Sequence, residues 1–388
     1  MTELVGGNTI TLLTGGREYF PALEAVCDMA RHEIHVETYI FDDDVAGRRI
    51  ARALRRAAGR GVATHLLVDG YGSKRLNSEL VAEMQRAGVS FLVYRPDIAP
   101  WRFPRQRLRR MHRKLAVIDA RIAFIGGINI IDDMHTPGHT PPRFDYALRI
   151  EGPLLASIYP VVKRLWTLVE FTQFGRGWHN QPRLDVAGDP RGDQRAAFVV
   201  RDNLRHRRDI EEAYLAAIAA ARSEILIANA YFFPGLSFRR ALMEAAARGV
   251  RVVLLLQGKV EYLLLHYASR ALYGAFLDAG IEIHEYHTGF LHAKVAVIDR
   301  YWATVGSSNI DPLSLLLARE ANVVIENRKF AVELRRSLYL TMEAGARQVK
   351  PEGWKGQPLP VRIATWLCYG LSRLLTGVFA YGRPREFT

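Results

Sequence analysis

The chain repeats itself, and this internal duplication constrains its fold more than any other feature. Residues 112–130 align without a gap to residues 292–310, and ten of the nineteen aligned pairs are identical. Upstream, a strand, a helix and a second strand that ends at glycine are expected within residues 31–70 and again within residues 222–258. Strands that alternate with helices in both halves predict an α/β protein with two similar lobes related by a pseudo-twofold duplication. We expect mixed, mostly parallel sheets flanked by helices.

Boundaries between the segments follow from changes in composition. A polar stretch that contains several glycines and prolines predicts a linker at residues 176–195. It separates a first lobe, residues 1–175, from a second lobe, residues 196–350. The remaining residues, 351–388, are expected to form an amphipathic C-terminal tail at a membrane interface.

The tail contains an apolar run, from Val361 to Tyr381, that is only just long enough to cross a bilayer. Arg362 and Arg373 interrupt the run and share one stripe of a helix, because eleven residues make about three turns. An arginine at the centre of a bilayer costs about 2.5 to 3.5 kcal/mol, whereas a helix in the plane of the interface keeps the stripe in water. We therefore favour an interfacial helix; a helix packed on the protein body and a membrane span are the alternatives.

Each copy of the repeat contains the motif His-x-Lys-x-x-x-x-Asp. Side chains alternate along a strand, so the histidine and the lysine face one side, while the aspartate has the opposite parity. The histidine and lysine are thus the reactive pair, and the aspartate is better placed for structural support. The candidate catalytic motifs consist of His112, Lys114 and Asp119 in the first copy and His292, Lys294 and Asp299 in the second.

An asparagine, Asn129 or Asn309, follows each motif histidine by 17 residues. Two lysines and two asparagines can neutralise and orient the oxygens of a phosphodiester, which is work that a metal ion does in other enzymes. One neutral imidazole can attack phosphorus to form a covalent phosphohistidine, and a second, protonated imidazole can donate to the leaving oxygen. Both protonation states are accessible near the ordinary histidine pKa of about 6.5. We expect no metal ion and no other cofactor.

The paired motifs resemble the HxKxxxxD signatures of the phospholipase D superfamily, over residues 7 to 351. Residues 110–114, 118–127, 229–235 and 302–314 are similar to bacterial cardiolipin synthases, and to their B-type branch in particular. The resemblance implies phosphatidyl transfer between two phosphatidylglycerol molecules through a phosphohistidine, with release of glycerol. The alternative is a phospholipase D or a nuclease-type phosphodiesterase, in which water resolves the intermediate. The acceptor lipid, phosphatidylglycerol, phosphatidylethanolamine or another alcohol, stays open.

The resemblance also implies roles for individual residues. Asp145 and Glu320 match the carboxylates that orient the catalytic histidines in this superfamily. His112 corresponds to the nucleophile and His292 to the general acid, although the near symmetry of the two copies leaves the opposite assignment open.

The net charge of +13, from 53 basic and 40 acidic residues, suggests an anionic partner such as nucleic acid, anionic lipid or a phosphate-bearing substrate. Only eight of the basic residues are lysines, so part of the arginine excess can reflect codon composition. Together with the resemblance, the charge favours an anionic bilayer over nucleic acid. The first residues lack a signal peptide. We expect peripheral association with the cytoplasmic face of the bacterial cell membrane, and protein partners stay open.

Overall fold

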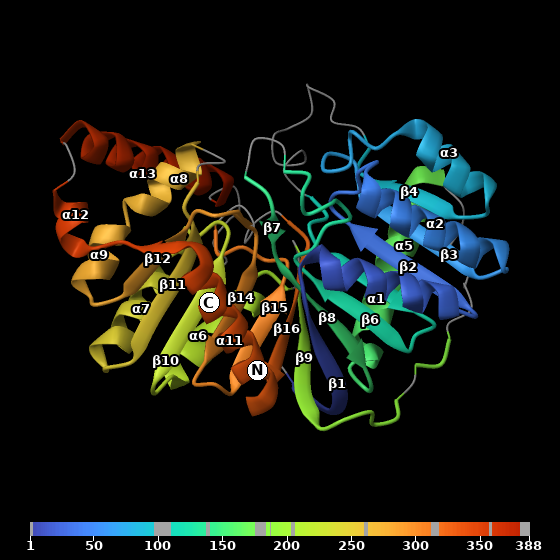
Figure 1. Ribbon diagram of the computed structural model, residues 1–388, viewed down its shortest axis with the longest axis horizontal. Coiled ribbons are helices and arrows are strands. Elements are labelled where there is room, and N and C mark those ends of the chain that lie inside the picture. The colour runs from blue at the N-terminus through green and yellow to red at the C-terminus, as the bar shows by residue number, and fades with distance from the viewer. Residues whose placement is uncertain are drawn as a thin grey trace, which may run out of the picture.

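The two lobes share one 15-stranded sheet, with the strand order β17-β12-β11-β10-β14-β15-β16-β9-β1-β8-β6-β5-β2-β3-β4. The computed structural model describes residues 3–96, 110–136, 140–174, 184–186, 188–202, 206–259, 263–311, 318–356 and 359–380. The strands on one side of the β9–β1 junction repeat those on the other side in reverse order (Figure 1). The predicted pseudo-twofold duplication is therefore visible in the topology.

The elements of the two lobes correspond in order along the chain. The first lobe contains β1 (Val5–Thr14), α1 (Gly15–Met29), β2 (Glu33–Thr38), α2 (Val45–Gly59), β3 (Ala63–Asp69), α3 (Ser78–Arg86), β4 (Ser90–Tyr94), β5 (Lys114–Ile118), β6 (Ile122–Gly126), β7 (Arg143–Phe144), β8 (Tyr146–Glu151) and α5 (Leu155–Phe174). The second lobe contains β9 (Gln194–Arg201), α6 (Asp209–Ala220), β10 (Glu224–Asn229), α7 (Leu236–Ala247), β11 (Arg251–Gln257), α8 (Leu263–Arg270), α9 (Tyr273–Asp278), β12 (Glu282–Tyr286), β13 (Phe290–Leu291), β14 (Lys294–Ile298), β15 (Trp302–Gly306), β16 (Glu320–Glu326) and α11 (Arg328–Gly345). The chain then continues through β17 (Ala346–Gln348), α12 (Pro351–Lys355) and α13 (Leu359–Ala380).

The sheet is mixed, as predicted, but parallel pairs do not dominate it. Parallel pairing joins β2, β3 and β4 in the first lobe and β10, β11 and β12 in the second. The strands nearer the junction pair antiparallel, because β5–β6 and β14–β15 are hairpins with tight turns. Asp119 and Ala120 both have φ of 51°, as the central residues of a type I′ hairpin turn require. The expected predominance of parallel pairs is corrected accordingly.

A shared hydrophobic core fixes the two lobes relative to one another. On the face of the sheet covered by α5 and α11, one continuous cluster contains Leu115 and Ile158 from the first lobe and Val295 and Leu334 from the second. Separate clusters lie under the helices on the opposite face of each lobe. Because the strands that carry both histidine motifs line the shared cluster, the two motifs are held in one rigid framework.

The C-terminal helix α13 packs on the body of the second lobe, beside α8 (Figure 1). Its Thr365 and Ser372 are buried, and the ring of Tyr369 lies 5.7 Å from that of Phe233. The structure therefore shows this helix packed on the protein body, and its contact with a membrane interface stays a prediction. Among the described residues, no helix is both long enough and apolar enough to span a membrane. Of the predicted linker at 176–195, residues 176–183 and 187 lie outside the described residues, and β9 already begins at Gln194.

Candidate active site

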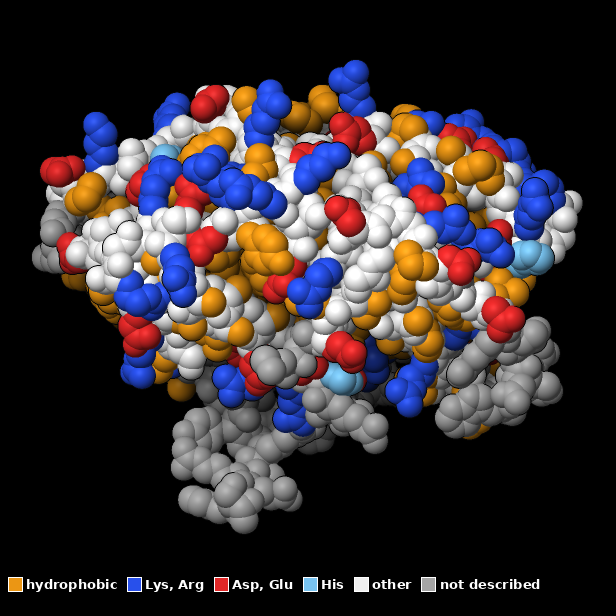
Figure 2. All heavy atoms as spheres, turned by 90° about the horizontal axis from the view of Figure 1, so that it is seen from below, with side chains coloured by type: hydrophobic (Ala, Val, Ile, Leu, Met, Phe, Trp, Pro, Cys, Tyr) orange, Lys and Arg blue, Asp and Glu red, His pale blue; other side chains and the backbone are white. Residues whose placement is uncertain are grey.

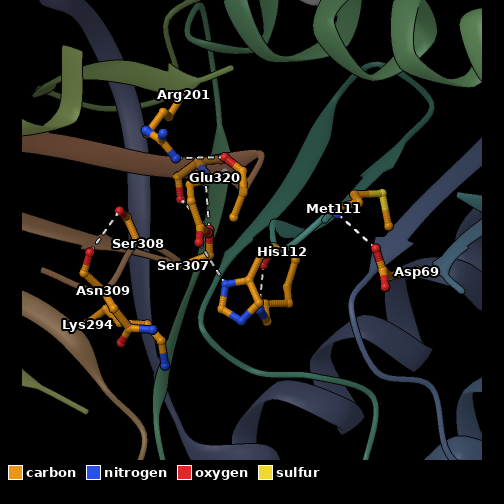
Figure 3. A network of polar contacts seen from close by, with 12 residues as sticks. Asp69, Met111, His112, Arg201, Lys294, Ser307, Ser308, Asn309 and Glu320 are labelled. Carbon is orange, nitrogen blue, oxygen red and sulfur yellow. Dashed lines mark hydrogen bonds and ion pairs between the residues drawn. The ribbon is translucent and has the colours of Figure 1, made fainter. Parts of the chain in front are cut away.

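His112 lies at the edge of the sheet, immediately before β5, and is bound to the other lobe. Its backbone N–H donates to the carbonyl oxygen of Arg319 (3.0 Å). Its imidazole Nδ1 lies 2.8 Å from Glu320 Oε1 at the start of β16 (Figure 3). The Glu320 side chain is fully buried, whereas 16% of the His112 side chain is exposed. The histidine of the first copy is therefore oriented by the carboxylate of the second.

His292 has the reciprocal arrangement. Its backbone N–H donates to the carbonyl oxygen of Phe144 (2.8 Å), and its Nδ1 lies 2.6 Å from Asp145 Oδ2. Short parallel pairing between β13 and β7 joins the two lobes at this point. The crossed histidine–carboxylate pairs bring both motifs together in a single site between the lobes.

Two buried lysines complete the cationic part of the site. The ammonium groups of Lys114 and Lys294 each donate to the backbone carbonyl of the histidine two residues earlier. Lys294 Nζ also lies 3.6 Å from Asp145 Oδ2. Each lysine therefore lies beside the backbone of its own histidine.

Burial and the neighbouring charges shift the pKa values of four groups at the centre of the site, His112, His292, Lys114 and Asp145. Burial lowers the pKa of His112, although the Glu320 carboxylate opposes the effect, and burial lowers the pKa of His292 well below its usual value. Burial also lowers the pKa of Lys114 to about 7 and raises that of Asp145 to about 6. Both imidazoles are therefore neutral near pH 7 until an anion enters the site. With Nδ1 facing a carboxylate, each imidazole presents Nε2 to a substrate.

Glu320 differs from Asp145 in its surroundings. Burial raises the pKa of Glu320, but the adjacent His112 and Lys114 outweigh burial and hold that pKa below its usual value. The hydroxyl of Ser307 donates to the second carboxylate oxygen of Glu320. Asp145 instead lies against Gly127, where an added Cβ would approach its carboxylate oxygens to 2.3 Å. The two histidines thus face carboxylates with unlike environments, although the motifs are repeated.

The two predicted asparagines are both buried at the site edge. Asn129 Oδ1 accepts a hydrogen bond from the backbone N–H of Ile40 (3.1 Å), which fixes the segment that follows β2. Asn309 Oδ1 is buried without a hydrogen-bond partner among the described residues. Phosphate binding by these two side chains stays a prediction.

The two motif aspartates lie at the other end of their strands. Asp119 accepts hydrogen bonds from the backbone N–H groups of residues 31, 32 and 33, and Asp299 does the same for residues 222, 223 and 224. Each carboxylate therefore ties a hairpin turn to the start of β2 or β10. These contacts support the structural role that strand parity favoured, and a catalytic role for the two aspartates stays a prediction.

Two further residues, Asp69 and Gln257, hold the chain just before each histidine. Asp69 Oδ2 accepts from the backbone N–H of Met111 (2.9 Å), as Figure 3 shows. Gln257 Oε1 accepts from the backbone N–H of Leu291 (3.1 Å). Neither contact was predicted from the sequence, although each is made by a polar residue that ends an apolar strand at the same place in its copy.

Tyr39 makes the site asymmetric. Its ring centroid lies 4.8 Å from that of His112 and 5.3 Å from Lys114 Nζ. The corresponding position in the second copy is Ala230. In the second copy the ring beside the histidine comes from a different place in the chain, because the ring centroid of Phe290 lies 5.6 Å from that of His292.

Within the described part of the chain, no group of three or more His, Cys, Asp or Glu side chains is arranged to hold a metal ion.

The chain matches the family described as "Cardiolipin synthase, PLD-like domain" over residues 23–137 and 214–339. It is 43% identical to cardiolipin synthase B of Escherichia coli over 344 residues, which cover 88% of this chain and 82% of the relative. It is 31% identical to a cardiolipin synthase of Geobacillus kaustophilus, over 94% of this chain and 72% of the relative.

Solved structures with the same fold include a phosphatidylserine synthase of Haemophilus influenzae. It matches with a TM-score of 0.73 and 13% identity over 97% of each chain. A polyphosphate kinase of Porphyromonas gingivalis matches with a TM-score of 0.58 and 13% identity, over 94% of this chain and 53% of the kinase. At these identities the likeness concerns the fold alone.

Proposed function

Because the chain belongs to the cardiolipin synthase family with phospholipase D-like domains, we propose that it transfers a phosphatidyl group between two phosphatidylglycerol molecules to make cardiolipin and glycerol. The observation that carries this proposal is the pair of crossed histidine–carboxylate contacts, with two buried lysines between the lobes. This set of groups provides a nucleophile, an acid and the positive charge that phosphodiester transfer needs.

In the first step, His112 Nε2 attacks the phosphorus of phosphatidylglycerol. The new N–P bond forms as the P–O bond to glycerol breaks, and protonated His292 gives its proton to the departing glycerol oxygen. Glu320 accepts the Nδ1–H hydrogen bond of His112 and supports the positive charge that develops on this ring. The phosphate anion itself raises the pKa of His292, so substrate binding prepares the acid.

In the second step, a hydroxyl group of another phosphatidylglycerol attacks the phosphohistidine. Neutral His292 removes the proton of that hydroxyl, the new P–O bond forms and the N–P bond breaks, which restores both histidines. Lys114 and Lys294 stabilise the negative charge on the phosphate oxygens in both transition states, and Asn129 and Asn309 orient the same oxygens. If water replaced the lipid hydroxyl, the product would be phosphatidic acid.

Lipid extracts from cells that lack other cardiolipin synthases test the proposal. Cells that make the wild-type chain should accumulate cardiolipin, whereas His112→Ala and His292→Ala should each abolish it. Phosphatidic acid in place of cardiolipin would support the hydrolytic alternative, and cardiolipin that is unchanged in both variants would exclude the mechanism. Purified enzyme with pairs of defined lipids identifies the acceptor, phosphatidylglycerol or phosphatidylethanolamine.

We also propose that the protein associates peripherally with the cytoplasmic face of the cell membrane. Both reactants are lipids that reside in a bilayer, and the chain carries a net charge of +13 that favours anionic headgroups. Nucleic acid is not required by any part of this proposal.

A further inference from the structure

We propose that two apolar stripes, one on α13 and one at the end of α5, dock the protein on a lipid bilayer with the histidine pair between them. The inference rests on the proposed function only for the lipid nature of the substrate. It goes beyond a C-terminal membrane anchor, because it assigns a membrane contact to each lobe and orients the active site toward the bilayer.

Most of the described large apolar side chains of α13 face away from the protein, and Tyr369 is the one that packs inward, against Phe233. The side chains that it buries against the second lobe, Thr365 and Ser372, are small and polar. The outward stripe has helical spacing and consists of Ile363, Trp366, Leu367, Leu371 and Leu374, which are 48% to 68% exposed. Seen along the helix axis, the centre of this stripe lies almost opposite the buried face. No side chain in the described part of the chain covers this stripe.

The second stripe lies at the C-terminal end of α5 in the first lobe. Leu168, Phe171 and Phe174 are 46% to 58% exposed and follow one another at intervals of three residues. The side chain of Gln173, between the two phenylalanines, donates to the backbone carbonyl of Val93 in β4. This contact fixes the end of α5 at the edge where the parallel strands of the first lobe end.

Both stripes lie at the edge of the sheet that carries the active site. The ring contact between Tyr369 and Phe233 places α13 over the segment that follows β10, whose last residue, Asn229, pairs with Lys294. In Figure 1, α13 lies at the upper left and the end of α5 emerges beside β4 at the upper right. A surface that touches both stripes therefore crosses the histidine pair.

The chemistry of the stripes favours a bilayer as their occupant. Trp366 lies at the border of the α13 stripe next to the exposed Arg373, and tryptophan with a flanking basic residue is typical of helices in a lipid interface. Exposed phenylalanines beside a site for lipid headgroups provide the apolar contact in the other lobe. By contrast, the face of the molecule at the opposite edge shows basic and acidic side chains interspersed (Figure 2). That face lacks the single-sign charge that attracts an anionic membrane.

Cosedimentation of the full chain with vesicles of phosphatidylglycerol and phosphatidylethanolamine tests the inference. The variants Leu367→Glu/Leu371→Glu and Phe171→Glu/Phe174→Glu should each bind vesicles at least tenfold more weakly than wild type. The matched control, Met29→Glu/Val332→Glu, changes two exposed apolar side chains at the opposite edge and should bind like wild type. Activity on lipid dispersed in detergent micelles should stay within about threefold of wild type in all three, which also shows that they fold.

Two results would contradict the proposed docking surface. If either stripe variant bound vesicles as tightly as the wild-type chain, the proposed contact through both stripes would be wrong. If the wild-type chain formed a stable dimer, and the two α13 substitutions dissociated this dimer without changing vesicle binding, the stripe would be a contact between two copies of the chain. The proposal that the stripe binds a bilayer would then be wrong. His112→Ala should bind vesicles normally, so a failure of the proposed chemistry would leave this result unaffected.

Discussion

Each motif histidine contacts a carboxylate that is remote in sequence. His112 contacts a residue 208 positions away, and His292 contacts one 147 positions away. The sequence predicted that Asp145 and Glu320 orient histidines, but not which histidine each one serves. That pairing depends on how the two lobes pack, and no local pattern encodes it. The same holds for Asp69 and Gln257, whose backbone partners lie 42 and 34 positions away.

Asp69→Ala tests the positioning role of this carboxylate. The substitution leaves the buried N–H of Met111 without an acceptor and frees the chain before His112. We expect kcat to fall about tenfold or more, because a displacement of about 1 Å can cost as much as 100-fold. Asp69→Asn keeps an acceptor oxygen and should retain activity within about threefold, while Gln257→Ala should reproduce the defect from the second lobe. Equal kcat values for Asp69→Ala and wild type, measured with micellar substrate, would refute the role.

The pH dependence of kcat/KM tests the lowered pKa of Lys114. Burial brings this pKa to about 7, so the free enzyme loses the ammonium charge as the pH rises through 7. If the charge stabilises the transition state, kcat/KM falls on the alkaline side of this value. Arginine in the Lys114→Arg variant keeps its charge at higher pH. We therefore expect the alkaline fall of kcat/KM to occur at a higher pH in this variant, even though its maximal rate is lower. An alkaline limb at the same pH in both proteins would contradict the assignment.

At the scale of the elements, the duplicated strands and helices were the most predictable part of the chain. The apolar residues of β5 and β14, the helices after β2 and β10, and the strands β3 and β11 were all expected from periodicity and are present. The extent of antiparallel pairing was not expected, because alternation of helices and strands does not reveal where a hairpin replaces a crossover. The outward orientation of the apolar stripe on α13 also depends on tertiary packing.

Asp119→Ala separates structural from catalytic roles within the motif. The carboxylate satisfies three backbone N–H groups at the start of β2, so its removal should lower the free energy of unfolding by about 2 to 4 kcal/mol. The folded variant should retain kcat within about threefold. Urea unfolding and steady-state kinetics at low temperature measure the two quantities, and Asp299→Ala is the counterpart in the second lobe. A loss of kcat comparable to that of His112→Ala in the folded variant would support a catalytic role for Asp119.

At the scale of the whole molecule, the shared core and the crossed carboxylates make the two lobes one catalytic unit. Neither lobe contains a complete pair, because Glu320 serves His112 and Asp145 serves His292. The duplication therefore provides two similar halves of one site, and the unlike environments of the two carboxylates give these halves different chemical properties. Recognition of the repeated motif was sufficient to predict a common site, while its internal asymmetry required the structure.

The covalent phosphohistidine is the central claim, and its location is the measurement that tests it most directly. Wild-type enzyme mixed with phosphatidylglycerol is quenched in alkaline denaturant, where phosphohistidine is stable, and is then digested for mass spectrometry. We predict a phosphatidyl adduct on the peptide that contains His112, and no adduct in the His112→Ala variant. An adduct on His292 alone would reverse the two roles, and the absence of any adduct during unimpaired cardiolipin synthesis would contradict the covalent route.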